Sequence, residues 1–498
     1  MSDSWIKDEL VTAELGDKRL NERFAVILDA FAERPNVSIP TAAGSGAATG
    51  GHAEIEAAYR FFDNDKVTPE KILKPHYDAT AKRCAAQDVV LCAQDTTELD
   101  FTRPQQQVVG AGPLDGSQRR GAFLHLNEAF SVDGTPLGAV SAKIWARDEP
   151  DPNEPQLSAA EKRKQRRALP IEEKESVRWL EGIRATQQLA AKCPDTLCVS
   201  LSDSEGDIYE LFAEPRTTEN FHLIVRACHD RVSLDEYGVS QGSIRDVLMQ
   251  QPVLATNEIS IRAREQKMVC VTQKRRKSRV GRDAMVEVRA CAVTIKAPNT
   301  CKHDVRSVTI NAVMVREVDP PQGEEPIEWI LLTTLPISTL AEVLHVIQYY
   351  TVRWMIEIYF RTLKSGCRIE ERRFETLPRM LACTAVYVIV AWRTLYVCRL
   401  GRSCPDMDCD VIFEPAEWQS VWTVTQPGKP LPKKPPPLAT MIRLIASLGG
   451  YVNRATRTTP TGQTEPAPPG VETLWKGLQR TRDLAWAWNA FGPGAKQK

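Results

Sequence analysis

Hydrophobic and polar positions recur with different periods along the chain, and these periods divide it into three predicted regions. Residues 1–75 contain two amphipathic segments with a helical period, 15–35 and 53–64, joined by a loop rich in Ala and Gly. From 76 to 400, short apolar runs typical of strands alternate with helical segments. Residues 401–498 are helical, with Pro-rich interruptions that indicate a linker. The patterns therefore predict an α/β core between two helical domains.

Two of the predicted strands end in an aspartate. Residues 89–94 (VVLCAQ) lead directly into Asp95, and residues 197–202 (LCVSLS) lead into Asp203. The ends of buried central strands are where α/β folds place their chemistry. Aspartate is also common in turns and at helix N-termini, which is the ordinary alternative for either residue. Asp207 is an alternative candidate for the second functional aspartate. We favour Asp203 because Asp203 follows the strand immediately.

A predicted helix around residues 350–364 carries an acidic and basic stripe. At about 100° per residue, five polar side chains fall within roughly 60–80° of one another. They are Tyr350, Arg353, Glu357, Arg361 and Lys364. An apolar stripe beside them predicts the buried face, and consists of Val352, Ile356, Phe360 and Leu363. The ordinary alternative is a solvent-exposed ladder of salt bridges.

Two strand-end aspartates and a glutamate on a cationic helix suit a divalent metal site. Hard cations such as Mg²⁺ prefer oxygen ligands and retain positions for water and phosphate. A pair of such ions can activate an attacking oxygen and stabilise a leaving one. Asp95, Asp203 and Glu357 are the candidate ligands.

The same residues resemble a known family. Tyr350, Arg353, Glu357 and Lys364 match the Y-x2-R-x3-E-x6-K signature of the bacterial DDE transposases of the insertion-sequence-four family without a change in spacing. Asp95 begins a DTT sequence that is also similar to this family. Further resemblances occur in order along nearly the whole chain, at LGDKRL, AYRFF, KESVRWL, PPQGEEPIEWILLTT and RLIASLGGY.

The resemblance implies a fold and a set of site residues. It implies a ribonuclease-H-like core with a mixed sheet, and a metal-binding and catalytic triad of Asp95, Asp203 and Glu357 holding two Mg²⁺ or Mn²⁺ ions. DNA contacts are implied for six residues, with Trp329 receiving a flipped base: Tyr350, Arg353, Arg361, Lys364, Arg226 and Trp329.

The resemblance also implies partners and a reaction. Residues 1–75 would recognise double-stranded transposon ends, and 401–498 would form a homodimer in the synaptic complex. Family members nick the transposon end, form and reopen a hairpin, and join the 3′ ends to target DNA. Two alternatives stay open: a metal-dependent nuclease that does not join DNA, and an inactive relative that acts as a DNA-binding repressor or inhibitor.

The predicted core contains a second β-rich stretch. Residues 237–328 include four segments with β-branched alternation, which predict a β-rich insertion that the family also carries: EISIRAR, KMVCVTQ, AMVEVRACAVTIKA and SVTINAVMVREV. Two basic runs are candidates for phosphate contact. Residues 162–167 (KRKQRR) are expected in a surface loop, and 274–282 (KRRKSRVGR) at a hairpin tip.

Composition narrows these expectations. The 498 residues carry a formal net charge of zero, so any DNA-binding surface must come from segregated patches. The polar start MSDSWIKDEL is unlike a signal peptide, which predicts a cytoplasmic protein. The apolar run 380–392 is too short to cross a bilayer and predicts a buried helix. Thirteen cysteines without a Cys-x-x-Cys pair argue against a zinc ribbon.

Overall fold

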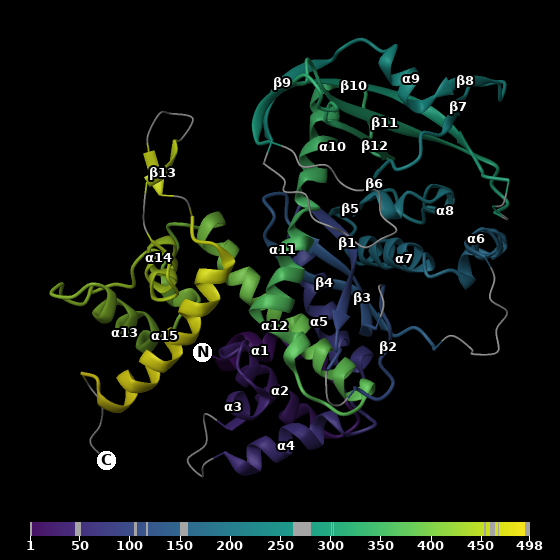
Figure 1. Ribbon diagram of the computed structural model, residues 1–498. Helices are drawn as coiled ribbons and strands as arrows, with labels where there is room; N and C mark the ends of the chain where they lie inside the picture. Colours follow the sequence, from purple (N-terminus) through teal and green to yellow (C-terminus); the bar gives the residue numbers. More distant parts are fainter. Residues whose placement is uncertain are drawn as a thin grey trace.

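The computed structural model places helices at both ends of the chain around one large sheet (Figure 1). It describes residues 2–493 apart from 45–50, 104–106, 116–117, 150–157, 262–279, 300, 302, 453–454, 459–463 and 467. The N-terminal helices lie below the sheet in Figure 1, and the C-terminal helices lie to its left.

The sheet has twelve strands in the described part of the chain, in the order β2-β3-β1-β5-β6-β12-β11-β10-β7-β8, with β4 beside β3 and β9 beside β10. β1, β5 and β6 are parallel, and β3 and β12 flank them antiparallel. The predicted mixed sheet is therefore present. The strands are β1 Val89–Asp100, β2 Gly112–Pro113, β3 Arg120–Phe130, β4 Pro136–Trp145, β5 Leu197–Ser202, β6 Phe221–Arg226, β7 Val232–Leu234, β8 Ser240–Ser243, β9 Ala255–Ile261, β10 Arg282–Lys296, β11 Ser307–Glu317 and β12 Glu328–Thr333.

Helices cover both faces of the sheet, and each face has its own hydrophobic core. Leu91 and Ala93 of β1 face the core formed with α10, α11 and α12, whereas Val90 and Cys92 face the core formed with α7 and α8. This alternation follows from the two-residue period of a strand. The helices of the core are α5 Pro69–Cys84, α6 Ala159–Ala168, α7 Val177–Lys192, α8 Tyr209–Ala213, α9 Ile244–Met249, α10 Leu340–Val352, α11 Met355–Arg361 and α12 Leu377–Ser403.

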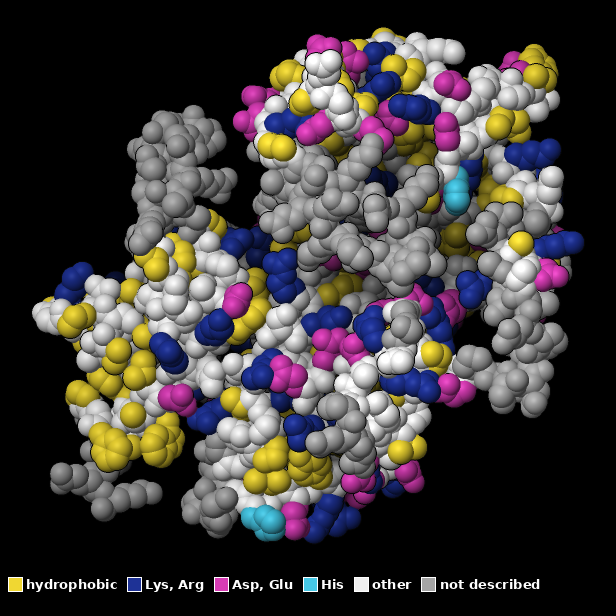
Figure 2. Space-filling view, viewed as in Figure 1, with side chains coloured by type: hydrophobic (Ala, Val, Ile, Leu, Met, Phe, Trp, Pro, Cys, Tyr) yellow, Lys and Arg dark blue, Asp and Glu magenta, His cyan; other side chains and the backbone are white. Residues whose placement is uncertain are grey.

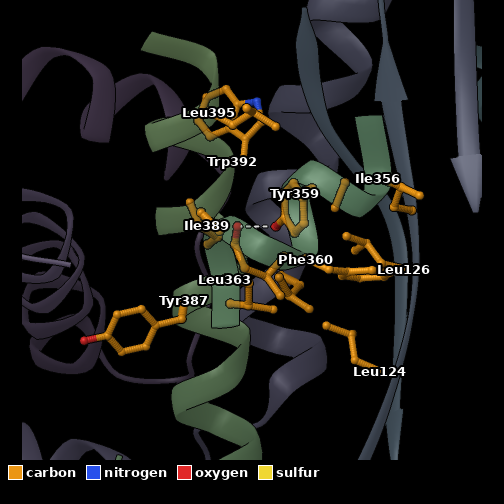
Figure 3. Close-up of a cluster of buried hydrophobic side chains, with 14 of the residues drawn as sticks. Leu124, Leu126, Ile356, Tyr359, Phe360, Leu363, Tyr387, Ile389, Trp392 and Leu395 are labelled. Atoms are coloured by element: carbon orange, nitrogen blue, oxygen red, sulfur yellow. Dashed lines mark hydrogen bonds between the residues drawn. The ribbon is translucent and has the colours of Figure 1, made fainter. Parts of the chain in front are cut away.

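The helix α12 is the centre of the first core. It is long and apolar enough to cross a membrane by composition, but 83% of its most apolar window is buried inside the protein. It is therefore the buried helix that the apolar run predicted. Tyr359 of α11 donates a hydrogen bond to the backbone oxygen of Val388, and Leu126 of β3 packs from the other side (Figure 3). These contacts fix α11 between α12 and the sheet.

The N-terminal region forms the helices α1 Ser2–Glu9, α2 Lys18–Glu33, α3 Ile39–Gly44 and α4 His52–Phe62. The two amphipathic segments predicted in the sequence match α2 and α4. Their apolar faces join the first core, where Phe24 stacks on Phe61. Lys18, Arg19 and Arg60 are exposed, while Arg23 is half-buried.

The C-terminal region consists of α13 Pro415–Thr425, α14 Leu438–Leu448 and α15 Val471–Phe491, with a separate small core. A short hairpin of β13 Ala455–Thr458 and β14 Thr464–Pro466 lies partly in the second Pro-rich interruption. Figure 2 shows hydrophobic side chains gathered around the end of α15. Trp486 and Phe491 are both exposed on that helix.

One further expectation is corrected by the structure, and another stays open. Residues 162–167 belong to α6 and not to a loop, because Ser158 and Glu161 form a capping box that starts a helix. The strands of 237–328 join the central sheet through β11 and β12. The segment KMVCVTQ and most of the basic run 274–282 lie outside the described residues. Reading the stretch as an insertion stays a prediction.

Candidate active site

The two strand-end aspartates lie side by side at one edge of the parallel strands. The last paired residues of β1 and β5 are Ala93 and Leu201. Asp95 and Asp203 each lie two residues further along, so the parallel register places them level with each other. Both also lie on the face of their strand that Ala93 and Leu201 share, which is covered by α10 to α12.

Arg226 and Trp329 extend this row to the next two strands. Ser202 of β5 pairs with Val225 of β6, so Arg226 is level with Asp203. Leu331 of β12 pairs with Arg226, which puts Trp329 just beyond the end of β6. Arg226 is exposed and Trp329 is half-buried against the first core.

β1 differs from its predicted form because it does not end at Asp95. It continues to Asp100 in an antiparallel hairpin with β3, after its parallel partner β5 has ended. Asp95 therefore lies where the strand keeps one neighbour and loses the other. The carboxylate of Asp95 therefore lies beyond the end of the β1–β5 pairing, while its backbone is still paired with β3.

Burial and a like charge act on Asp95. Its side chain is 13% exposed. Burial, followed by the negative charge of Asp203, raises the pKa of Asp95 to about 7, although Arg353 opposes the shift. Excess negative charge in a partly dry site is the condition that a bound cation relieves.

Arg353 links the first and third members of the predicted triad. Its guanidinium lies 3.2 Å from Asp95 Oδ2 and 3.7 Å from Glu357 Oε1. Glu357 is more open than Asp95, with 42% of its side chain exposed. The single guanidinium thus faces two carboxylates from the helix side of the site.

The helix that carries Arg353 and Glu357 is not continuous, contrary to the single helix predicted. α10 ends at Val352 and α11 begins at Met355. Around this break the backbone hydrogen bonds span three residues instead of four, for example from Glu357 N to Trp354 O. After Arg361 the chain forms a π-helical turn, Thr362–Gly366. The predicted apolar stripe is nevertheless buried throughout.

The remaining residues of the polar stripe have different surroundings. Tyr350 is buried, and its phenol is close enough to Arg226 and Asp203 to interact with both charges. Lys364 donates to the backbone oxygen of Glu98 at 2.7 Å and lies 3.2 Å from Glu370 Oε1. Arg361 is exposed, and its charge lies near Glu472 of α15.

Asp207, the rival for the second position, is fully occupied by protein groups. It is buried, it accepts hydrogen bonds from the backbone N–H groups of Cys228 and His229 at 2.7 and 2.9 Å, and it pairs with Arg231. Asp203 accepts a local hydrogen bond from Glu205 N at 2.8 Å, and within the described residues no cation is paired with it at salt-bridge distance. This difference favours Asp203 as a ligand.

The donor set fits a hard divalent cation. Asp95, Asp203 and Glu357 offer only carboxylate oxygens, and the raised pKa of Asp95 indicates negative charge that lacks a full counterion. Within the described residues, no three His, Cys, Asp or Glu side chains are already gathered closely enough to hold a metal. Glu357 remains apart from the aspartates on the far side of Arg353.

Two residues that adjoin Asp95 were not among the predicted site residues. Thr96 N donates to Asp95 Oδ1 at 2.7 Å, and Arg178 Nε donates to Thr96 Oγ1 at 2.8 Å. Both lie in segments quoted for the family resemblance, DTT and KESVRWL. No periodicity in the sequence indicates that α7 reaches this strand.

Three family models match the chain in succession. A transposase DNA-binding model matches residues 2–67, a transposase DDE domain matches 173–388, and a Tn5 transposase dimerisation domain matches 389–486. The chain carries the three domains of a Tn5-type DDE transposase. It is a DNA transposase with a DNA-binding and a dimerisation domain. The DDE match includes Asp203 and Glu357 and begins after Asp95.

The mixed sheet, the flanking helices and the DDE match fit a ribonuclease-H-like fold. DDE domains use divalent metal ions as a class, in agreement with the carboxylate donor set. Among solved structures, a cryo-EM structure of the piggyBac transposase synaptic complex with hairpin DNA matches at 9% identity and a TM-score of 0.33, covering 80% of this chain and 67% of that chain.

Proposed function

We propose that this transposase cuts transposon ends by metal-dependent hydrolysis and hairpin transesterification and joins the 3′ ends to target DNA. The observation that carries the proposal is the level row of Asp95 and Asp203 with Glu357 opposite, bridged by Arg353. The detailed likeness to the transposase of the kanamycin-resistance composite transposon, through the Tyr-Arg-Glu-Lys signature, is part of the same proposal.

The three carboxylates would hold the metal ions. When bound there, Mg²⁺ or Mn²⁺ would activate a water or the 3′-hydroxyl of the DNA for attack and would stabilise the leaving oxygen. Arg353 and Arg226 would bind phosphate oxygens on either side of the aspartates, since a guanidinium matches the geometry of phosphate. The buried phenol of Tyr350 would hold Arg353 and Arg226 in place through its interactions with both guanidinium groups. Lys364 would tie the π turn to β1, with a phosphate contact remaining a prediction.

The triad is tested by isosteric substitution. Asp95→Asn, Asp203→Asn and Glu357→Gln should each abolish cleavage of the flanking DNA in Mg²⁺ while leaving end binding intact. Asp207→Asn is the matched control and should still cleave at a rate close to that of the parent, corrected for the folded fraction. Normal cleavage by Asp203→Asn, with none by folded Asp207→Asn, would reverse the assignment of the second ligand.

End recognition is proposed for the N-terminal region. Deleting residues 1–75 would cut α5 in half and remove the buried Glu9, so substitution is the cleaner test. Combined Lys18→Ala and Arg60→Ala should weaken end binding and flatten its salt dependence, by roughly one unit of slope per lost phosphate contact. Combined Lys433→Ala and Lys434→Ala, in an exposed loop, is the control. Equal binding by both pairs would move recognition elsewhere.

Trp329 is proposed to receive a flipped base in the hairpin step. Its half-buried position beyond the end of β6 supports this role, and the alternative is a tryptophan that only fills the core. Base stacking contributes about 1–3 kcal/mol, whereas loss of a core tryptophan costs roughly 3–5 kcal/mol of stability. Trp329→Ala should stay folded, nick the first strand and accumulate nicked DNA without hairpins. Unfolding, or hairpins at the parental rate, would refute the pocket.

Dimer formation is proposed to use the exposed end of α15. Trp486 is 69% exposed and Phe491 83% exposed, and large apolar side chains at such exposure favour a partner.

Strand transfer by the purified protein separates the proposed transposase function from its two alternatives. A simple nuclease would cleave DNA without joining it, and an inactive relative would bind DNA without cleaving it. All three triad carboxylates are present in this chain.

A further inference from the structure

A chain of hydrogen bonds runs behind Asp95 on the opposite face of the sheet. Arg178 Nε lies 2.8 Å from Thr96 Oγ1, and Thr96 Oγ1 lies 2.9 Å from His125 Nδ1. His125 Nε2 lies 3.2 Å from Gln94 Oε1, and Gln94 Nε2 lies 3.0 Å from Ser200 Oγ. The chain therefore connects α7, β1, β3 and β5 through the two residues that flank Asp95.

The Gln94 side chain sets the direction of the bonds to His125. Gln94 Nε2 donates to Ser200 Oγ, so Gln94 Oε1, which can only accept, faces His125 Nε2, and that nitrogen must carry the proton. A neutral ring then leaves His125 Nδ1 to accept from the Thr96 hydroxyl, while Thr96 Oγ1 accepts from Arg178 Nε. Burial and the nearby charges of Arg178 and Lys143 lower the pKa of His125, in agreement with a neutral ring.

The chain lies where β1 needs support. Regular pairing of β1 with β5 ends at Ala93, one residue before Gln94. Beyond that point β3 is the strand that pairs with β1 in the described part of the chain. The Gln94–Ser200 bond is the next tie to β5 after the ladder ends, and the Thr96–His125 bond ties β1 to β3 at a directly paired position.

The members of the chain are packed so that they have little freedom. Gln94 and Ser200 are fully buried, and His125 is almost so. His125 packs edge-on against Trp179, and a Cβ atom on Gly182 would lie 2.0 Å from Gln94 Oε1. Asn127 meanwhile holds the Gly182 carbonyl at 2.9 Å. Trp179 and Gly182 of α7 thus pack directly on His125 and Gln94 of the hydrogen-bonded series.

We propose that Thr96 and His125 are positioning residues, whose directed hydrogen bonds hold the Asp95 carboxylate in place for metal binding and DNA cleavage. Metal sites require their ligands to be held within about 0.5 Å, and groups that orient a ligand are commonly worth 10–100-fold in affinity or rate. The inference rests on the proposed function for its activity readout only.

A matched pair at Thr96 tests the role of the hydroxyl. Thr96→Val keeps the shape and the strand preference of threonine but leaves Arg178 Nε and His125 Nδ1 without a partner. Thr96→Ser keeps the hydroxyl and loses a methyl group. Thr96→Val should lower the single-turnover cleavage rate at saturating DNA about 10–100-fold and raise the Mn²⁺ concentration needed for half-maximal binding, with end binding unchanged. Thr96→Ser should recover most of both losses.

The contrary outcomes are distinct. Parental cleavage and Mn²⁺ binding by Thr96→Val, or an equal loss in Thr96→Ser, would overturn the proposal, because the hydroxyl would then be irrelevant. Gly182→Ala disturbs Gln94 from the helix side without touching Asp95 or Thr96. It should reproduce the phenotype of Thr96→Val, and a folded variant with parental Mn²⁺ binding would count against the chain.

A measurement on the unmodified protein keeps the proposal testable if a variant fails to fold. Histidine-selective ¹⁵N NMR should show His125 protonated on Nε2 and bare on Nδ1 at neutral pH, with the His125→Asn spectrum providing the assignment. Protonation on Nδ1 would overturn the directed chain. If the parental protein binds Mn²⁺ and shows this tautomer but cleaves no end DNA, the proposed function fails while the positioning role stands.

Discussion

Two groups of charged side chains lie against the central sheet, and they differ in how well their charges are matched. In the first, Glu9 of α1 contacts His76 and Arg83 of α5, with Trp392 of α12 beneath. Ala139 N donates to His76 Nε2 at 3.0 Å, so the ring is neutral and donates to Glu9 from Nδ1. Glu128 is also buried near Arg83 and Glu9, but burial raises its pKa well above the ordinary value, so it is uncharged. One carboxylate, that of Glu9, therefore faces one guanidinium, and both are hydrogen-bonded.

The candidate active site has the opposite balance. Arg353 faces both Asp95 and Glu357, and Asp203 adds a third carboxylate beside Asp95. The consequence is visible in the direction of the pKa shifts. Burial by itself raises the pKa of Glu9, but His76 and Arg83 outweigh it and the pKa lies below its ordinary value. Burial and Asp203 raise the pKa of Asp95 to about 7.

The difference separates a structural cluster from a ligand site on physical grounds. A matched cluster such as Glu9, His76 and Arg83 gains nothing from a further ion. A site whose nearby arginines still leave a buried carboxyl group with a raised pKa, as at Asp95, gains from binding a further cation. Asp207, only four residues after Asp203, belongs to the matched type because Arg231 and two backbone N–H groups satisfy it.

The largest effect is expected at the matched cluster. Glu9→Gln keeps the size of the side chain but leaves the Arg83 cation without its partner, and breaking such a buried pair costs about 3 kcal/mol of unfolding free energy. Chemical denaturation of the full-length protein measures the loss. Asp483→Asn removes the exposed pair with Arg34 and should cost less than about 1 kcal/mol. A stability within that smaller range for Glu9→Gln would show that the cluster contributes little.

The second prediction is a stability change of opposite sign at Asp95. An acid whose pKa is higher in the folded state stabilises that state fully below its unfolded pKa, near 3.8, and this contribution is lost as pH rises through about 7. Asp95→Asn should therefore raise the unfolding free energy by about 2 kcal/mol at pH 8 in EDTA, with little change at pH 4.

Glu9 supplies the internal contrast for that experiment. Its pKa is lowered by folding, so its contribution is present above pH 4.5 and is lost as pH falls. The loss of stability caused by Glu9→Gln should therefore become smaller as pH falls. The gain of stability caused by Asp95→Asn should also become smaller as pH falls, although it has the opposite sign. A destabilising Asp95→Asn at pH 8 in EDTA would mean that Arg353 fully compensates the site.

Much of this comparison could be predicted from local sequence patterns, and part of it could not. The apolar runs before Asp95 and Asp203 predicted the buried strands β1 and β5, because strand period and buried runs are local properties, whereas the pairing of the two strands is seen only in the structure. The helical period around Glu357 predicted the buried stripe but missed the break after Val352, since two helix-compatible segments can be joined by a tightened turn.

Long-range pairing accounts for the rest. β1 continues past Asp95 because β3 pairs with it, and no pattern within residues 89–100 distinguishes that from a strand that stops. Glu9 and His76 are 67 positions apart and lie in ordinary helices, so their sequence does not indicate contact. The Thr96–His125 bond likewise depends on the register of two strands.

The smallest effect is expected from metal ions themselves. A ligand at ten times its dissociation constant stabilises the folded state by about 1.4 kcal/mol. Addition of Mn²⁺ or Mg²⁺ without DNA should therefore raise the melting temperature of the parental protein modestly, and chelation should reverse the shift. Asp203→Asn should abolish the shift because it removes a proposed ligand, whereas Glu9→Gln should keep the full shift from a lower starting temperature. If Glu9→Gln lost the shift and Asp203→Asn kept it, the matched cluster would be the cation site, and the distinction drawn between the two regions would be wrong.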